Sequence, residues 1–294
     1  MMEQLAQALP PAAEIQQDVD EALREDVGSG DVTAALLPDS EDVAYLLCKE
    51  DGVLAGGAWF EACHKALDPG VEITWFANDG DRIFAGTVLA LLNGHSRAIV
   101  TAERSSLNFL QTLSGTATTV RRYVDAVGDH KLRVLDTRKT IPGLRLAQKY
   151  AVLCGGGLNH RFGLYDTVML KENHIRAAGS IANAVASARS QYPSLPLVIE
   201  VENLDQLREA LDTECTRILI DDFPVELRRE AVRIAAGRIP LEVSGGVTYE
   251  NIAEIAADGV DYVSIGGLTK HLHALDLSLK LGPPPSSVKL ASRQ

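Results

Sequence analysis

Cysteine is scarce in this sequence, and the few cysteines lie far apart. Cys48, Cys63, Cys154 and Cys215 form no C-x-x-C pair, so their spacing supports neither a disulfide framework nor a zinc site. Cys154 precedes three glycines and could be read as a nucleophile, but we favour a small core residue there. We therefore expect reduced thiols, most of them buried.

Long apolar runs and a basic N-terminus are also missing. No segment offers 18 uncharged apolar residues, the length that a membrane-spanning helix needs. The N-terminus carries acidic residues and prolines where a signal peptide would need a basic start and a continuous apolar stretch. We expect a cytoplasmic protein with no membrane partner.

Positive charge is in deficit, because 28 Lys and Arg face 40 Asp and Glu and give a formal net charge of -12. An acidic chain repels polyanions at long range, which argues against a nucleic-acid partner. The hydrophobic content of 46%, with 24 glycines and 12 prolines, is typical of a globular protein with one large or two moderate domains.

The first third of the chain predicts a small α+β domain. Between about residues 43 and 100, short apolar runs are separated by Asp-Gly and Gly-rich turns, a pattern that is typical of an antiparallel sheet. Before these runs, Ile15 and Val19 have helical spacing, so a helix should pack on the sheet. Residues 101–127 then predict a long helix linking two domains, with Thr101 as its N-cap.

After about residue 130, strand and helix patterns alternate. Six apolar strand candidates end near residues 136, 170, 200, 220, 243 and 265, a spacing that fits βα units with right-handed crossovers. Polar or glycine residues stand at each strand end: Arg138 and Lys139, Lys171, Glu200, Asp221, Ser244 with Gly245 and Gly246, and Gly266 with Gly267. Strand ends converge on one face of a barrel but spread along the edge of an open sheet, so we favour an α/β barrel over a doubly wound sheet.

The groups on this predicted face suit two kinds of ligand. Glycine turns at helix N-termini offer backbone N–H groups to a phosphate, and carboxylates such as Glu200 and Asp221 are commonly bridged to phosphates by Mg2+. Arginine binds planar carboxylates through two parallel hydrogen bonds, so several arginines indicate a ligand with more than one carboxylate. We predict a phosphosugar diphosphate and a polycarboxylate.

Several other polar residues have simpler interpretations. We expect Arg145 and Lys149 to be solvated or to complement a helix dipole. His174 is expected to cap its helix or to form a local pair rather than to contact substrate. Glu200 alternates with Glu202, so only one of them can lie on the inward face of the strand, and periodicity alone does not choose between them.

Five segments carry a specific resemblance. They are "AERSSLNFLQTLSGTAT", "LDTRKTIPGLRLAQKYAVLCGGGLNHRFGLYD", "MLKENHI", "IEVENLDQL" and "YVSIGGLTKHLHALDLSL". Over roughly residues 20 to 280, the sequence resembles the quinolinate phosphoribosyltransferases, also called decarboxylating nicotinate-nucleotide pyrophosphorylases, pentosyltransferases of de novo NAD synthesis. The "DTRKT" and "GGGxNHR" blocks are the most specific part of this likeness.

The resemblance implies an architecture of two domains. An N-terminal α+β sandwich domain over residues 1–105 would be rejoined by about 272–284, and residues 106–271 would form an incomplete α/β barrel of six to seven strands. Because six strands are visible, a seventh is expected near the linking helix. The Pro- and Ser-rich residues 285–294 are expected to form a disordered tail.

The resemblance also assigns the carboxylate-binding residues. Quinolinate would be bound by Arg138, His160, Arg161 and Lys171. Arg104 of the "AER" segment would come from the second subunit of a homodimer, or of a higher oligomer built from such dimers.

The remaining assignments concern phosphoribosyl diphosphate and the metal. Lys139 and Lys171 would contact this substrate, with Thr137 of the same "DTRKT" segment, and Ser244, Gly245, Gly246, Gly266 and Gly267 would hold its 5′-phosphate. By the resemblance, Glu200 rather than Glu202 would serve Mg2+ and the ribose hydroxyls together with Asp221. Lys139, Lys171, Glu200 and Asp221 are the expected catalytic residues. Asp222 stands where the family usually shows Asn, which adds negative charge beside the metal region.

The implied reaction converts quinolinate and 5-phosphoribosyl 1-diphosphate to nicotinate mononucleotide, CO2 and diphosphate. A nicotinate-type phosphoribosyltransferase of the same fold is the alternative, but its substrate lacks the second carboxylate and would need fewer arginines. A phosphosugar isomerase or aldolase would need a Schiff-base lysine or a carboxylate base. A metabolite-binding protein without catalysis could keep every anion contact, although two metal carboxylates favour an enzyme.

Overall fold

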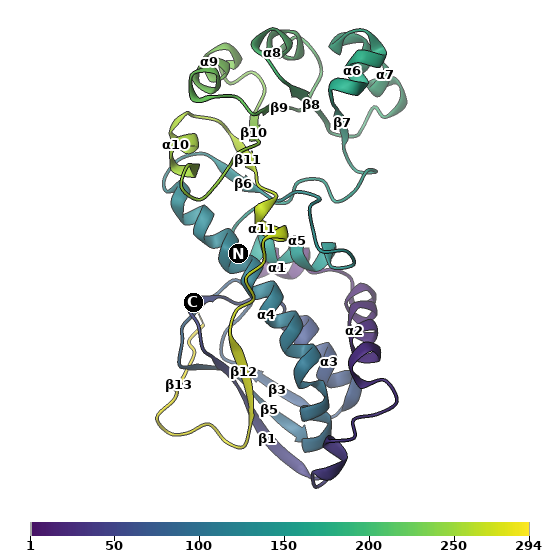
Figure 1. The fold of residues 1–294 in the computed structure, drawn as a ribbon, viewed down its shortest axis with the longest axis vertical. Coiled ribbons are helices and arrows are strands. Elements are labelled where there is room, and N and C mark those ends of the chain that lie inside the picture. Colours follow the sequence, from purple (N-terminus) through teal and green to yellow (C-terminus); the bar gives the residue numbers. More distant parts are fainter. Residues whose placement is uncertain (1, 294) are drawn as a thin grey trace. The chain divides into compact units, whose positions relative to one another are not determined.

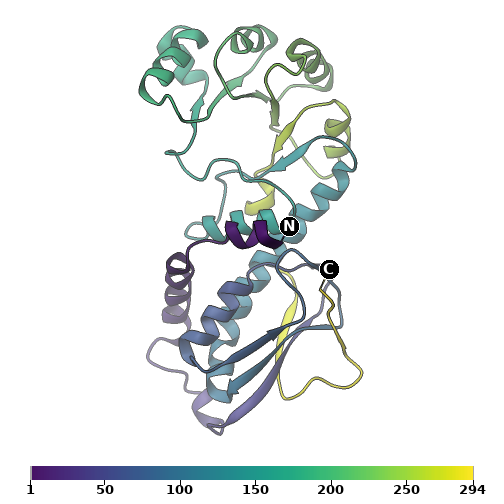
Figure 2. The same cartoon turned by 180° about the vertical axis from the view of Figure 1, so that it is seen from behind.

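A computed structural model describes residues 2–293 of the chain. The chain forms two compact units, shown from two sides in Figures 1 and 2. Unit 1 comprises Met1–Arg121, Thr140–Gly156 and Leu268–Gln294, and unit 2 comprises Arg122–Lys139 and Gly157–Gly267. The division thus falls at Arg121 rather than near residue 105, because one helix continues from unit 1 into unit 2.

Unit 1 is built on the antiparallel sheet that the sequence predicts. Its central strands are β1 (Glu41–Cys48) and β5 (Thr87–His95), which pair antiparallel. Strand β12 (Leu277–Leu281) pairs antiparallel with the other edge of β1, and β3 (Glu72–Trp75) pairs antiparallel with β5. Strands β2 (Gly52–Val53) and β4 (Arg82–Ile83) form a separate two-stranded ribbon.

The C-terminal residues are ordered, contrary to our prediction of a disordered tail. Strand β13 (Lys289–Leu290) pairs with the start of β5, and the Arg293 guanidinium donates a hydrogen bond of 3.0 Å to the Trp75 carbonyl oxygen. Composition missed this because the stabilising partner is a strand about 200 residues away in the sequence.

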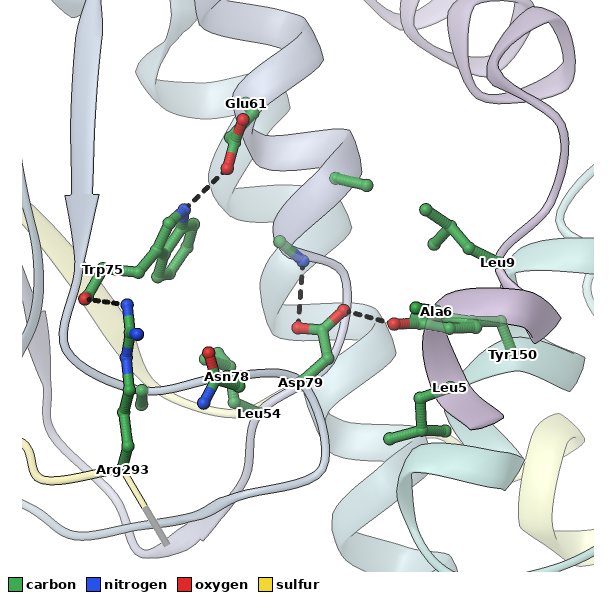
Figure 3. A pocket seen from close by; sticks show the side chains of 13 residues that line it. Leu5, Ala6, Leu9, Leu54, Glu61, Trp75, Asn78, Asp79, Tyr150 and Arg293 are labelled. Carbon is green, nitrogen blue, oxygen red and sulfur yellow. Dashed lines mark hydrogen bonds between the residues drawn. The ribbon is translucent and has the colours of Figure 1, made fainter. Parts of the chain in front are cut away.

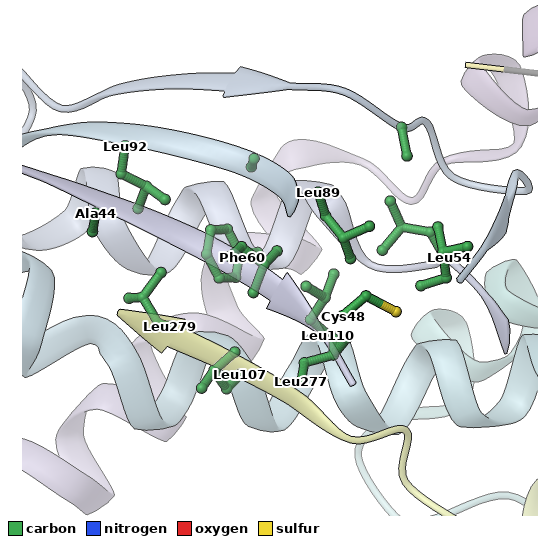
Figure 4. Packing of buried hydrophobic residues seen from close by; sticks show 14 of the residues in the cluster. Ala44, Cys48, Leu54, Phe60, Leu89, Leu92, Leu107, Leu110, Leu277 and Leu279 are labelled. Carbon is green, nitrogen blue, oxygen red and sulfur yellow. The ribbon is translucent and has the colours of Figure 1, made fainter. Parts of the chain in front are cut away.

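The helices of unit 1 are α1 (Met2–Ala8), α2 (Ala12–Val27), the 3-10 turn η1 (Ala34–Leu36), α3 (Gly57–Leu67), α5 (Arg145–Cys154) and most of α4 (Ser96–Val127). Helix α2 buries Ile15, Val19 and Leu23, the apolar positions whose spacing indicated a helix. Figure 4 shows how Phe60 of α3 and Leu110 of α4 pack with leucines of the sheet. This apolar layer is the core of unit 1.

Helix α4 begins five residues before the predicted N-cap. Strand β5 ends at His95 and the helix starts at Ser96 without a loop. The Ser96 hydroxyl donates to the Pro38 carbonyl oxygen, and the Thr101 hydroxyl contacts the Asp31 carboxylate. The cap-like pattern at Thr101 therefore marks a tertiary contact inside the helix.

Unit 2 contains six parallel strands in the order β6-β11-β10-β9-β8-β7. Their bounds are β6 Arg133–Leu135, β7 Val168–Leu170, β8 Leu197–Val201, β9 Arg217–Asp221, β10 Leu241–Ser244 and β11 Tyr262–Ser264. The helices α6 (Glu172–Ala178), α7 (Ile181–Gln191), α8 (Leu204–Leu211), α9 (Val225–Ala235) and α10 (Ile252–Ala257) lie outside the curved row of strands (Figure 1). The edge strands β6 and β7 do not pair with each other, so the predicted incomplete α/β barrel is confirmed.

A full seventh strand near the linking helix is not found among the described residues. Instead, a single parallel bridge joins Leu135 of β6 to Leu158. Leu158 also exchanges backbone hydrogen bonds with the strand, since its N–H donates to the Val134 carbonyl and its carbonyl accepts from Asp136. The sheet is thus extended beside β6 by one residue only.

The faces of the parallel strands differ in chemistry. Ile218 and Ile220 of β9 are fully buried, while Arg217, Leu219 and Asp221 alternate with them and share the other face. The register places Ser244 of β10 beside Asp221. The apolar face suits the covering helices, which leaves the opposite face for polar side chains.

All four cysteines are free and buried, as predicted. Burial raises the pKa of Cys63 to about 12 and lifts the pKa of Cys154 well above its ordinary value, so Cys154 is a core residue rather than an activated thiol. Among the described residues, no helix combines the length and apolarity that crossing a membrane requires.

Candidate active site at the strand ends of unit 2

The ends of β6 and β11 meet at a glycine. A Cβ atom built on Gly266 would lie 2.7 Å from Cδ of Lys139 and 3.5 Å from Oγ1 of Thr137. The Thr137 hydroxyl accepts a hydrogen bond of 3.0 Å from the Lys139 backbone N–H. The lysine stem therefore passes closely over Gly266, and three predicted site residues come together.

Asp136 ties the next predicted residues to the end of β6. This carboxylate is fully buried, and it accepts hydrogen bonds from the His160 backbone N–H at 2.8 Å and the Asn159 amide at 2.7 Å. Two short bonds to one buried carboxylate hold the segment after the Leu158 bridge against the strand end.

Arg138 and Arg161 form a concentrated positive charge. Burial lowers the pKa of the half-buried Arg161 guanidinium, and the nearby positive charge of Arg138 lowers it further. Two like charges that perturb each other in this way favour an anion between or beside them. The predicted pair of carboxylate-binding arginines is thus brought together on unit 2.

Lys171 and Glu200 connect the ends of β7 and β8. The Lys171 ammonium lies 2.5 Å from Glu200 Oε2, and the Glu200 side chain is only 16% exposed. Glu202 is exposed, so Glu200 is the glutamate on the site face, as the resemblance implied. His174 Nδ1 accepts a hydrogen bond of 3.1 Å from the Lys171 N–H, which confirms the capping interpretation of His174.

Asp221 lies in an acidic environment at the end of β9. Burial raises the pKa of its carboxyl group, and the negative charges of Glu200 and Asp222 raise it further. Such mutual repulsion would be relieved by a divalent cation. Among residues 2–293, no preformed group of three or more metal-ligating side chains is found. Glu200 and Asp221 are oxygen donors of the kind that would suit Mg2+, which typically takes one or two carboxylates and completes its shell with water and phosphate oxygens.

The turn after β10 depends on glycine at Gly245. Its φ is 87°, and a Cβ atom there would lie 2.2 Å from Asp222 Oδ1. Asp222 itself has a φ of 54°, a left-handed conformation that Asp and Asn tolerate better than other residues. Its N–H donates to the Ser244 carbonyl oxygen at 3.0 Å. The Asp in place of Asn is thus compatible with the local backbone.

Of the two glycine turns predicted to begin helices, the second does so directly and the first does not. Helix α10 begins only at Ile252, after a turn in which Asn251 donates a hydrogen bond to the Gly246 carbonyl oxygen. Gly267 opens α11 (Gly267–Lys270), a helix of four residues. Exposed backbone in these turns, rather than long helix N-termini, is what unit 2 offers to a phosphate.

Two predictions outside this face have different outcomes. Lys149 is fully buried, so its predicted solvation is wrong; most residues of helix α5 are buried. Arg145 is half-buried and donates to the Thr140 hydroxyl. Arg104 is exposed on α4 of unit 1, and its role in a partner's site stays a prediction.

Glu242 is a polar residue of this face that the sequence pattern did not predict. Glu242 of β10 is fully buried, and its carboxylate contacts His160 and Arg217. The signal was present, since Glu242 stands two positions before Ser244 and must share its face. It was overlooked because it lies within an apolar run rather than at the strand end.

A cavity of about 520 Å³ in unit 1 is a competing location, shown in Figure 3. Its polar groups include Glu61 and Asp79, and none of the predicted site residues lines it. Asp79 accepts hydrogen bonds from Gly56 N–H, Gly57 N–H and the Tyr150 hydroxyl, so it caps helix α3. Arg293 also lines the cavity, but with Glu61 and Asp79 beside it this single cation does not make a site for polyanionic substrates.

Comparisons with known proteins agree with this geometry. Residues 31–114 match the model of the quinolinate phosphoribosyl transferase N-terminal domain, and residues 116–280 match that of the C-terminal domain. The chain is 42% identical to quinolinate phosphoribosyltransferase [decarboxylating] 2b, mitochondrial, from Nicotiana tabacum, over 92% of this chain and 83% of that protein. It is 39% identical to the probable nicotinate-nucleotide pyrophosphorylase [carboxylating] of Bacillus subtilis, over 90% of this chain and 92% of that protein.

A solved structure gives the same result. The nicotinate-nucleotide pyrophosphorylase from Francisella tularensis superposes with a TM-score of 0.91 at 44% identity, covering 92% of this chain and 97% of that chain. Both matched family models are quinolinate models, which disfavours the nicotinate-type alternative. With two domain models matched in order and relatives similar over nearly the whole length, this chain belongs to the quinolinate phosphoribosyltransferase family.

Proposed function

We propose that this protein transfers the phosphoribosyl group of 5-phosphoribosyl 1-diphosphate to quinolinate and releases CO2, forming nicotinate mononucleotide for NAD synthesis. The observation that carries this is the division of charge on one face of unit 2. Arg138 and Arg161 concentrate positive charge, whereas Glu200 and Asp221 concentrate negative charge. The first region suits a dicarboxylate, and the second suits a diphosphate accompanied by a divalent cation.

The first step needs no general base. The pyridine nitrogen attacks C1′ of the ribose with its own lone pair, while the bond from C1′ to the diphosphate oxygen breaks and the diphosphate leaves with that electron pair. Mg2+, when bound through Glu200 and Asp221, would neutralise charge on the leaving diphosphate. Lys139 and Lys171 supply fixed positive charge for the same purpose.

The second step follows from the charge created in the first. The ring nitrogen is now a cation, so the bond between C2 and its carboxyl carbon can break with the electron pair remaining on C2. CO2 leaves, and a proton from solvent completes C2. Arg138 and Arg161 would hold the 3-carboxylate and keep the ring oriented while the 2-carboxylate departs.

Substrate binding must change the partner of Lys171. Without substrate, its ammonium neutralises Glu200 at 2.5 Å. When a cation and a diphosphate arrive, Glu200 gains a stronger positive partner and Lys171 gains phosphate oxygens. We propose this exchange as the way a partly exposed ion pair avoids leaving either charge unmatched.

The direct test is an assay with quinolinate, phosphoribosyl diphosphate and Mg2+, following CO2 and nicotinate mononucleotide. We expect turnover that stops in excess EDTA and returns with Mg2+ or Mn2+. Nicotinate should be a far poorer substrate, because losing one charge-assisted contact costs about 2 to 5 kcal/mol, or roughly 30-fold to several-thousand-fold. Equal use of both acids, or full activity in EDTA, would contradict the corresponding part of the proposal.

We also propose a cytoplasmic homodimer in which Arg104 completes the partner's site. If so, Arg104→Ala and Lys139→Ala should each be nearly inactive alone. In heterodimers formed from both variants, one site carries both lesions and the other neither. Random reassortment then restores about a quarter of wild-type activity. No recovery, with heterodimers verified by mass spectrometry, would mean that Arg104 does not act in trans.

A further inference from the structure

Glu242 lies in an ion cluster beneath the strand ends of unit 2. It stands in the middle of β10, two residues before Ser244, and is fully buried. Its Oε1 lies 3.4 Å from His160 Nε2, and its Oε2 lies 3.0 Å from Arg217 Nη1. Each carboxylate oxygen therefore lies near a different nitrogen, in a charge contact that lacks hydrogen-bond geometry.

The cluster keeps Glu242 ionised. Burial by itself would raise the pKa of Glu242, but its contact with His160, the charge of Arg217 and the Ser264 hydroxyl together lower that pKa. The Arg217 guanidinium lies 5.0 Å from the centre of the Tyr262 ring, a cation–π arrangement that fixes it in place. A buried ion pair is weak grounds for stability, since apolar residues often serve equally well, so its presence calls for another explanation.

The His160 ring is oriented from both sides. His160 Nδ1 accepts a hydrogen bond of 2.7 Å from the Arg161 backbone N–H, so Nδ1 carries no proton in this arrangement. The Nε2 atom then carries the proton, and the negative charge of Glu242, whose Oε1 lies 3.4 Å from Nε2, favours a proton at that position. The carboxylate thereby selects the tautomer that can receive the Arg161 N–H.

The oriented His160 ring restrains the backbone of Arg161. Its guanidinium is close enough to Arg138 for that charge to lower its pKa after burial has done so. Two repelling guanidiniums stay in a binding arrangement only if their backbone is firmly held. The contact from Arg161 N–H to His160 provides one such restraint, and Asp136 holds the His160 N–H at 2.8 Å.

We propose that Glu242 is a positioning residue for substrate binding: through the His160 tautomer it fixes the backbone of Arg161 and preorganises the Arg138 and Arg161 pair for the dicarboxylate. This inference rests on the proposed function for the identity of the ligand. It also changes the role of His160, whose ring nitrogens serve the protein's own Arg161 and Glu242 rather than the substrate alone.

The Glu242→Gln variant tests whether Glu242 affects substrate binding in addition to the stability of the fold. A glutamine has one acceptor oxygen and one donor NH2, so it cannot accept from both Arg217 and His160. The charged Arg217 should take the oxygen, leaving the NH2 facing His160 Nε2. The proton would then move to Nδ1, where it opposes the Arg161 N–H.

Asp258 offers a matched control. Its buried carboxylate also bridges two cations, Arg228 at 2.8 Å and Arg229 at 2.7 Å, but both of these partners belong to helix α9. Asp258→Asn should lower the melting temperature while leaving the KM for quinolinate unchanged. Glu242→Gln should raise the KM for quinolinate about 10- to 100-fold, as expected when a binding group loses its preorganised geometry. The KM for phosphoribosyl diphosphate should stay close to wild type.

The tautomer can be read directly in the wild-type protein. Two-bond proton–nitrogen spectra of 15N-histidine-labelled protein, assigned with His160→Gln, should show His160 protonated on Nε2 and bare on Nδ1. A proton on Nδ1 in the wild type would overturn the proposal even if Glu242→Gln does not fold. An unchanged KM for quinolinate in folded Glu242→Gln would also overturn it. Absent turnover in the wild type would instead count against the proposed function, and the tautomer result would stand on its own.

Discussion

The two units bury ionisable groups in different ways. In unit 1, His64 is buried against Phe60, with 4.7 Å between ring centres, and burial lowers its pKa to about 4, so it is neutral. Phe60 belongs to the apolar layer of Figure 4. In unit 2, Glu242 is equally buried but ionised, and it contacts Arg217 and His160.

This difference arises from the surface that each sheet must cover. The sheet of unit 1 closes an apolar core, where a charge without a partner is costly and neutral forms are favoured. The strands of unit 2 already bury one face, including Ile218 and Ile220, against helices. Their other face is free to carry paired charges that orient binding groups. Unit 1 should therefore respond to substitution mainly through stability, and unit 2 through substrate binding.

The largest expected effect is on the core of unit 1. Phe60→Ala removes a fully buried ring and should lower the free energy of unfolding by about 3 to 5 kcal/mol. Denaturant unfolding measures this loss. Activity per folded molecule at reduced temperature should remain near wild type. A rise in KM would contradict the distinction between a unit that responds through stability and a unit that responds through substrate binding.

Arg161→Ala tests the opposite case in unit 2. It should reduce kcat/KM for quinolinate by roughly 30-fold to several-thousand-fold, corresponding to about 2 to 5 kcal/mol, because Arg138 loses its partner in carboxylate binding. Thermal unfolding should change little, since removing one guanidinium relieves its repulsion with Arg138. A large fall in melting temperature with unchanged kinetics would assign Arg161 to the scaffold.

The neutral His64 predicts a pH dependence of stability. Its pKa is about 4 in the folded state against an ordinary value of 6.5, so the unfolded chain binds the extra proton between these values. The contribution is complete above pH 6.5 and is lost as the pH falls, the loss approaching about 3 kcal/mol near pH 4. His64→Leu should flatten this part of the wild-type curve, and parallel curves would rule out His64 as the cause.

The smallest effect is expected on the surface of unit 2. Arg208 pairs with Asp205 at 2.8 Å on exposed helix α8. Arg208→Ala should change the free energy of unfolding by no more than about 0.5 kcal/mol, with kinetics unchanged. This variant is the control for Arg161→Ala. A marked change in its kinetics would show that charge anywhere on unit 2 influences binding.

Local patterns predicted those features that local forces determine. The βα alternation indicated six strands and placed Lys171, Glu200 and Asp221 at strand ends, because apolar runs of strand length with polar ends have few other solutions. The capping role of His174 was equally local. These parts of the fold and site needed no knowledge of distant contacts.

Distant contacts explain the features that sequence reasoning missed. Lys149 is buried together with most of helix α5, which the helix pattern alone does not reveal. The C-terminal strand β13 is ordered by β5, and Thr101 interacts with Asp31 rather than capping a helix. Glu242 was missed because the two residues that it contacts, His160 and Arg217, lie far from it in the sequence.

The pairing of β12 with β1 has a consequence for folding kinetics. The two strands lie near opposite ends of the sequence, so β1 keeps one open edge until nearly the whole chain has been synthesised. Such late, long-range closure slows folding and leaves an edge that other chains can pair with. Nascent chains ending before Leu277 should therefore aggregate more readily than the complete chain, because β12 covers the open edge of β1 only after it has been synthesised.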